Sequence, residues 1–421
     1  MKQSARKQSA RRLAVVSATA LALMVTGCSS KADEGAGTTE GGVKTGPGIS
    51  AKKITLGTLT DISGPGAALG KPLLQSMQLT FEKANKDGGV CGRTIELEVR
   101  DHGLDVQKAV AGYAELKDKV AAMPMLVGSA QTAALMDSLE KDKMLTFAGS
   151  FSSTLLGHNA LQVVGTTYAV DMVNGLPYLV ETAGLKAGDK VGVVYVDGEY
   201  GGDALKGLKY AAEKAGVTLV EQAVKPTDSD MTAQVTALKQ AGVKAIAAAV
   251  LPPQTASLVG VAAASGLQVP VLANGTAFAP QLLATPAGPA IEKMLRLSTP
   301  FGPVTGDSPT LKAAVAAYQA KYPQEPLSQA VQVGALDAGI VVDALKNACK
   351  AGDLSREGIL KALRGMKDYD SLVGKLDFSD TSMPSSAASY VLKPSKAAPG
   401  GLVLEREATE APDTAGYLAQ G

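Results

Sequence analysis

Residues 54–102 read ITLGTLTDISGPGAALGKPLLQSMQLTFEKANKDGGVCGRTIELEVRDH, and this stretch decides the fold. It predicts a strand, a turn rich in glycine and proline, a helix and a second strand. Apolar residues recur at three- and four-residue spacing from Leu74 to Ala84, which gives the helix one buried face. A helical crossover makes the two strands parallel, and the carboxyl ends of such strands carry the functional surface. We therefore expect the turn at residues 61–70 to lie at the rim of a cleft.

The same stretch resembles the opening of the type I periplasmic binding proteins, in the leucine/isoleucine/valine-binding branch that feeds ABC importers. That opening has a strand, S-G-P, a few small residues, a glycine, a long helix ending near G-G, and a strand ending in Asp. These landmarks occur here in the same order, and the resemblance extends from about Lys53 to about Glu405. The resemblance implies two lobes joined by a hinge of three chain crossings.

Strands and helices continue to alternate downstream, in two blocks. This alternation predicts an α/β fold with two doubly wound, mainly parallel-sheet lobes. The resemblance sets the crossings near residues 165, 296 and 382. The first lobe is then residues 53–165 and 297–382, the second lobe is residues 166–296 and 383–405, and residues 406–421 form a C-terminal tail.

The first 27 residues predict a secretory signal peptide. Five basic residues and no acidic ones precede a short apolar run that cannot span a membrane. The run ends in Val-Thr-Gly-Cys, which resembles the bacterial lipoprotein box with Cys28 as the lipidated residue; the alternative is an incidental cysteine. Residues 28–52 are rich in Gly, Thr and Ser, which is typical of a flexible tether. This layout predicts a lipid anchor on the extracytoplasmic face of the membrane, at the cell surface or in the periplasm.

The composition argues against several other classes of protein. Removal of the signal peptide leaves 36 basic against 40 acidic residues, and the basic residues are scattered, so we expect no nucleic-acid binding. Two histidines without matching cysteines predict no metal site. The serine cluster at residues 149–153 lacks the second glycine of a hydrolase elbow, and the glycines near residue 64 do not fit a dinucleotide motif. We expect neither a cofactor nor enzyme activity.

Two cysteines remain once Cys28 is set aside. An exported chain with two cysteines favours a disulfide. By the resemblance both Cys91 and Cys349 belong to the first lobe, so a bond between them is expected; two buried thiols are the alternative.

Short hydroxyl and amide side chains follow the predicted strand ends. Beside helix N-termini, such groups suit a carboxylate or another polar anion. In the resembling family, serine and threonine residues at these places hold the ligand's α-carboxylate, and a tyrosine of a D-x-x-x-Y-G turn covers the ligand. The predicted ligand-binding residues are Ser129, Gln131, Thr132, Ser150, Ser152, Tyr200 and Asn274. The alternative for each is a capping or turn residue.

The chain departs from the amino-acid receptors where they bind the ligand's ammonium group. Their second-lobe Glu is replaced by the sequence Asn-Gly-Thr at residues 274–276, and their first-loop tyrosine by Leu69. Because a buried ammonium without a carboxylate is costly, an amino-acid ligand needs Asp61, Asp197 or Glu199 as a substitute. The expected ligand is therefore either a branched-chain amino acid or a small carboxylate or amide.

The predicted function is capture of a small polar solute by closure of two lobes, followed by delivery to an ABC-type permease. The lipid on Cys28 holds the receptor near its transporter, and the protein is expected to be a monomer. The alternative is a ligand-sensing lipoprotein of the same fold that signals to a partner.

Overall fold

The computed structural model of the chain describes residues 39–40 and 42–420. The predicted signal peptide and the lipidation site at Cys28 lie outside the described residues. The described part opens with a short antiparallel ribbon of β1 (Thr39–Glu40) and β2 (Val43–Lys44). Among the described helices, none has the length and apolar character needed to cross a membrane.

Five parallel strands form the sheet of the first lobe, in the order β4–β3–β5–β6–β7. They are β3 (Lys53–Thr60), β4 (Thr94–Asp101), β5 (Met123–Val127), β6 (Thr146–Gly149) and β7 (Leu161–Gln162). The strand order reverses between β3 and β5. Ligand crevices form outside the carboxyl ends of parallel strands at such a reversal.

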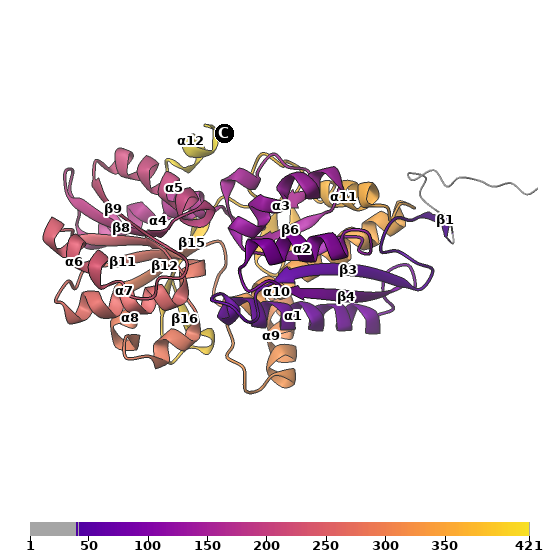
Figure 1. Cartoon of the computed structure of the whole chain (residues 1–421), viewed down its shortest axis with the longest axis horizontal. Coiled ribbons are helices and arrows are strands. Elements are labelled where there is room, and N and C mark those ends of the chain that lie inside the picture. Colours follow the sequence, from indigo (N-terminus) through magenta and orange to yellow (C-terminus); the bar gives the residue numbers. More distant parts are fainter. Residues whose placement is uncertain (1–38, 41, 421) are drawn as a thin grey trace, which may run out of the picture. The chain divides into compact units, whose positions relative to one another are not determined.

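The helices of the first lobe come from two distant parts of the chain, and Figure 1 shows the orange helices among the indigo and purple ones. The helices are α1 (Ala67–Lys86), α2 (Val106–Leu116), α3 (Ser129–Lys141), α9 (Pro309–Lys321), α10 (Gln329–Lys350) and α11 (Arg356–Arg364), followed by the ribbon β13 (Tyr369–Ser371) and β14 (Gly374–Leu376). Helices α1 and α10 pack closely, because a Cβ on Gly334 would lie 2.2 Å from the carbonyl oxygen of Leu73.

Seven strands form the sheet of the second lobe, in the order β16–β15–β12–β11–β10–β8–β9. They are β8 (Lys190–Val196), β9 (Thr218–Val224), β10 (Ala245–Ala249), β11 (Val271–Asn274), β12 (Leu295–Thr299), β15 (Ser389–Pro394) and β16 (Leu402–Thr409). Strands β15 and β16 are antiparallel to their neighbours, and the other five are parallel. The parallel five repeat the order of the first sheet, so the same reversal falls between β8 and β10.

The second lobe carries six α-helices in the described residues. They are α4 (Tyr168–Ala183), α5 (Glu199–Ala215), α6 (Thr232–Ala241), α7 (Pro252–Ala264), α8 (Gly288–Met294) and α12 (Thr414–Leu418). Short 3₁₀ turns are η1 (Ser153–Leu155) in the first lobe, and η2 (Gly275–Ala277), η3 (Pro280–Ala284) and η4 (Pro399–Gly401) in the second. The confirmed fold class is therefore α/β with two doubly wound lobes.

Three segments connect the two lobes, at residues 163–167, 300–308 and 377–388. The predicted second crossing at residue 296 falls inside β12, which stays in the second sheet as far as Thr299. The predicted C-terminal tail also differs, since β16 continues to Thr409 and α12 packs Tyr417 against α4. In both places the second lobe extends further along the chain than predicted, through strand pairing as far as Thr299 in β12 and through strand pairing followed by helix packing as far as Tyr417.

A disulfide joins Cys91 to Cys349 across 258 residues of sequence, with 6.2 Å between the two Cα atoms. Cys91 follows α1, and Cys349 lies in the last turn of α10. The bond therefore ties together the two helices that pack against each other in the first lobe.

Candidate ligand-binding site

A cavity of about 390 Å³ lies where the carboxyl ends of both sheets meet, and we call it the interlobe cavity. Its wall is built from segments that follow strands β3, β5 and β6 in the first lobe and β8, β10 and β11 in the second. In each sheet, the strand ends beside the reversal of strand order therefore point into the same cavity. This is the position that the parallel-sheet rule assigns to a ligand.

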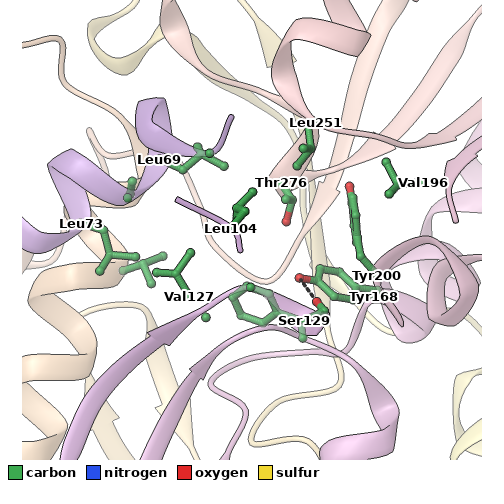
Figure 2. Close-up of a pocket in the computed structure, with 18 of the residues that line it drawn as sticks. Leu69, Leu73, Leu104, Val127, Ser129, Tyr168, Val196, Tyr200, Leu251 and Thr276 are labelled. Atoms are coloured by element: carbon green, nitrogen blue, oxygen red, sulfur yellow. Dashed lines mark hydrogen bonds between the residues drawn. The ribbon is translucent and has the colours of Figure 1, made fainter. Parts of the chain in front are cut away.

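Most of the wall is apolar, as the aliphatic side chains of Figure 2 show. Among the labelled residues these are Leu69, Leu73, Leu104, Val127, Val196 and Leu251. Phe278 and Phe301 add further apolar surface. Of the described residues that line the cavity, none is Lys, Arg or His.

Aromatic rings cross from one lobe to the other at one side of the cavity. The ring centroids of Tyr168 and Tyr200 lie 4.7 Å apart, and those of Phe151 and Tyr168 lie 5.6 Å apart. Phe151 also meets Phe301 edge-on at 6.0 Å. These edge-on and tilted contacts are the arrangements that aromatic rings prefer, and they join the strand end of β6 to helices α4 and α5.

The polar part of the wall centres on the N-terminus of α3. The Ser129 hydroxyl accepts a hydrogen bond from Ser150 Oγ at 2.8 Å and lies 3.4 Å from the hydroxyl of Tyr168, a contact drawn in Figure 2. The residue before the helix, Gly128, offers no side-chain cap. The first N–H groups of an α-helix have no partner within it, and its N-terminus attracts negative charge. This part of the wall therefore suits a carboxylate.

Gly128 fits its position for two reasons. Its φ is +103°, which L side chains rarely adopt, and a Cβ there would lie 2.1 Å from Oε1 of Gln131. The amide nitrogen of Gln131 donates to the carbonyl of Leu104 at 2.5 Å, so the same side chain also fixes the neighbouring loop.

The structure divides the seven predicted ligand-binding residues into two groups. Ser129, Gln131 and Tyr200 line the interlobe cavity. The other four lie behind the wall and hydrogen-bond to residues that line it. Thr132 donates to the Gly128 carbonyl, Ser150 donates to Ser129, and Ser152 donates to Glu199. Asn274 accepts a hydrogen bond from the Tyr200 hydroxyl at 2.7 Å. The roles of all seven in ligand binding stay predictions.

Several lining residues were missed at the level of sequence. Tyr168 begins α4 directly after the first crossing, and Phe301 follows β12 in the second crossing. Neither position follows a strand end within a βαβ unit, so the pattern used for prediction could not find them. Thr276 belongs to the predicted Asn-Gly-Thr turn, but it is this residue and not Asn274 that faces the cavity.

The three acids considered as substitutes for the missing Glu have different surroundings. Asp61 accepts backbone N–H groups of Gly64 and Gly66 at 2.5 and 2.7 Å and shapes its own turn. Glu199 accepts hydrogen bonds from two first-lobe hydroxyls, those of Ser152 and Thr154, each at 3.1 Å. Asp197 is exposed at the cavity rim.

Another acid, Asp171, lies in the first turn of α4 and was not predicted as a site residue. It lines the cavity although its side chain is buried, and burial raises its pKa to about 7. The nearby Asp203 acts in the same direction, whereas hydrogen bonds from Thr166 and Ser389 oppose the rise. Burial also raises the pKa values of the Tyr168 and Tyr200 hydroxyls, which stay protonated donors.

A cavity enclosed by the strand ends and helix N-termini of two α/β lobes defines a two-lobed solute receptor. The chain belongs to the periplasmic binding protein family, which matches residues 53–398. A solved structure of a fatty acid ABC transporter substrate-binding protein from Thermomonospora curvata is 44% identical, with a TM-score of 0.87. Its match covers 89% of this chain and 97% of that one.

Two curated relatives are more distant. The leucine-, isoleucine-, valine-, threonine-, and alanine-binding protein of Pseudomonas aeruginosa is 26% identical, over 79% of this chain and 87% of the relative. The Leu/Ile/Val-binding protein homolog 3 of Brucella melitensis is 27% identical, and the match spans 46% of this chain and about half, 53%, of the relative. Family membership confirms the predicted class, an extracytoplasmic solute-binding protein, and these relatives favour transport over the signalling alternative.

Proposed function

We propose that the protein captures a monocarboxylate with an apolar chain, of the fatty-acid type, and delivers it to the permease of an ABC importer. The observation that carries this proposal is the aliphatic and aromatic lining of the interlobe cavity around one polar corner at Ser129. The description of the 44% identical relative as a fatty acid receptor supports the same ligand class.

The size of the cavity suits a chain of medium length. A volume of about 390 Å³ corresponds to roughly a dozen non-hydrogen atoms, at the ~30 Å³ that a water molecule takes in the liquid. Each buried methylene contributes about 0.8 kcal/mol, so a chain of this length supplies the main part of the affinity. The carboxylate then lies between the α3 N-terminus and the first turn of α4, where the hydroxyls of Ser129 and Tyr168 meet and where Asp171 also lines the cavity.

A branched-chain amino acid is the second candidate, because acids of the second lobe reach the cavity. Asp197 and Glu199 at its rim, or the buried Asp171 in its wall, would have to receive the ammonium group. Glu199 already accepts two hydroxyl hydrogen bonds, and Thr276 stands in the turn that carries the Glu of the amino-acid receptors. The apolar monocarboxylate therefore fits better.

The attachment and the partners belong to the same proposal. The lipid on Cys28 holds a monomeric receptor at the membrane, and residues 28–52 act as its tether. An attached receptor has a raised effective concentration at its permease, which compensates for modest docking affinity.

Thermal unfolding of the mature chain, with Cys28→Ser to keep it soluble, tests the ligand class. The panel contains hexanoate to palmitate, decanol, decanamide, leucine and valine. A ligand at one hundred times its dissociation constant stabilises the native state by about 2.7 kcal/mol, a shift of a few degrees in Tm. We expect shifts with medium-chain carboxylates, whereas a shift with leucine or valine alone would refute the proposal in favour of the amino-acid candidate.

A further inference from the structure

Asp171 is a buried acid in the wall of the interlobe cavity, and within the described part of the chain only one of its two carboxyl oxygens is hydrogen-bonded. Its Oδ1 accepts two hydrogen bonds, from Thr166 Oγ1 at 2.6 Å and from Ser389 Oγ at 2.7 Å. Within residues 42–420 no hydrogen bond to its second carboxyl oxygen, Oδ2, is found, and the side chain is only 3% exposed. Since Asp171 lines the cavity, Oδ2 is the atom left for a ligand.

The charge of the cavity poses a problem for a carboxylate ligand. Its described lining holds three acids, Asp171, Asp197 and Glu199, and no basic side chain. An anion that enters would meet a like charge without a countercharge. Two carboxyl groups in one site resolve such repulsion by keeping one proton between them.

We propose that Asp171 shares one proton with the acidic end group of the ligand, so that a carboxylate binds together with a proton. This inference rests on the proposed function. The proton comes from solvent, forms an O–H bond on Asp171 Oδ2 or on the ligand, and donates a hydrogen bond to the other oxygen. It returns to solvent when the ligand leaves, and no other bond forms or breaks.

The surroundings of Asp171 support proton uptake near neutral pH. Burial raises the pKa of Asp171 to about 7, and Asp203 on α5, whose own pKa is also raised by burial, acts in the same direction, so Asp171 gains or loses its proton in the neutral range. The other ionisable group that interacts with Asp171 is the hydroxyl of Tyr200, which is not cationic. From strand β12, Ser298 donates to the backbone carbonyl of Asp171 at 2.7 Å and brings no charge.

The pH dependence follows from these protonation states. At pH 8 free Asp171 is mostly ionised, so binding of a carboxylate takes up close to one proton. At pH 6 free Asp171 is mostly protonated, so the uptake falls toward zero. The dissociation constant of a carboxylate ligand rises above pH 7, toward tenfold per pH unit, whereas that of a neutral ligand does not change.

Isothermal titration calorimetry of the mature Cys28→Ser chain with decanoate tests the inference. Heats at pH 8 in phosphate and in Tris, whose ionisation enthalpies differ, give the number of protons taken up. We expect close to one proton for the otherwise unchanged protein and none for D171N, whose amide can still donate to a carboxylate. The matched control is D137N, an exposed residue farther along α3, which we expect to take up the same proton as the unchanged protein.

The outcomes separate the two proposals. Binding of decanoate without proton uptake at pH 8, or equal uptake by D171N, overturns the role of Asp171 and leaves the fatty-acid ligand intact. Absence of binding by every carboxylate overturns both proposals. If D171N fails to fold, the unchanged protein still decides, because decanoate affinity must fall from pH 7 to pH 9 while decanol affinity stays constant.

Discussion

At the scale of single residues, Thr276 sets the charge that the ligand meets. It stands in the turn where the amino-acid receptors place a carboxylate, and its hydroxyl lies near that of Tyr168. We expect T276E to weaken medium-chain carboxylate binding at least tenfold, because a fourth acid in a cavity without a base repels the ligand. Calorimetric dissociation constants check this. The control T236E, on the exposed face of α6, should bind the ligand as the parent protein does. Equal or tighter binding by T276E would contradict the position assigned to the ligand's carboxylate near Thr276.

Gly128 offers a second test at the same scale. An alanine there combines a positive φ with a clash against Gln131, so it should displace the first turn of α3. We expect G128A to lose about 1–2 kcal/mol of stability and at least tenfold in decanoate affinity. Gly157 has a φ of +85° with open space around its Cβ position, so G157A isolates the backbone strain without the clash. An affinity loss equal in both variants would refute a specific role for the α3 N-terminus.

All seven predicted site residues follow strand ends, but only Ser129, Gln131 and Tyr200 line the cavity. Their part in ligand binding stays a prediction. Tyr168 and Phe301 were not predicted, because they lie on chain crossings whose place is set by the packing of both lobes. Local sequence patterns do not predict that packing.

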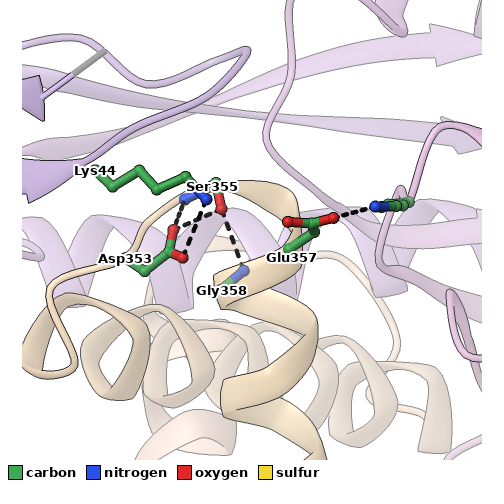
Figure 3. Close-up of polar contacts among 6 residues, drawn as sticks. Lys44, Asp353, Ser355, Glu357 and Gly358 are labelled. Atoms are coloured by element: carbon green, nitrogen blue, oxygen red, sulfur yellow. Dashed lines mark hydrogen bonds and ion pairs between the residues drawn. The ribbon is translucent and has the colours of Figure 1, made fainter. Parts of the chain in front are cut away.

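At the scale of elements, the N-terminus of α11 shows how the returning chain is fixed, as drawn in Figure 3. The Ser355 hydroxyl accepts from the N–H of Gly358 at 3.3 Å and donates to Asp353 Oδ1 at 2.5 Å. Asp353 in turn pairs with Lys44 at 3.4 Å. Because the helix loses its cap, S355A should destabilise the protein by about 1 kcal/mol without changing ligand affinity.

Urea unfolding of S355A, with ligand binding measured on the same sample, checks this expectation. S138A on the exposed face of α3 is the control, and its stability should stay within about 0.5 kcal/mol of the parent. A loss of affinity in S355A would mean that the cap acts on the cavity as well as on stability.

The order of elements could be predicted because hydrophobic periodicity and glycine-rich turns recur along both lobes. Their ends were less predictable. Helix α3 begins at Ser129 directly after a glycine, and no side-chain cap marks its start. Helix α7 begins at Pro252, although proline often ends a helix, because proline is compatible with the first turn.

At the scale of the whole molecule, closure depends on hydrogen bonds that cross from one lobe to the other. The hydroxyls of Ser152 and Thr154 in the first lobe both donate to Glu199 at the start of α5 in the second. Ser153 donates to Asp203 on the same helix. These bonds exist only when the lobes are together, so they stabilise the closed state independently of the ligand.

Removal of the two Glu199 contacts should therefore shift the population toward the open state. We expect the double variant S152A/T154V to bind decanoate about 5- to 20-fold more weakly, as two partly exposed hydrogen bonds to a charged group contribute about 1–2 kcal/mol together. The loss should fall on the dissociation rate, because the bonds form after the ligand has entered. Stopped-flow displacement measures that rate, with T236V on α6 as the control. An unchanged dissociation rate would show that the ligand alone holds the lobes together.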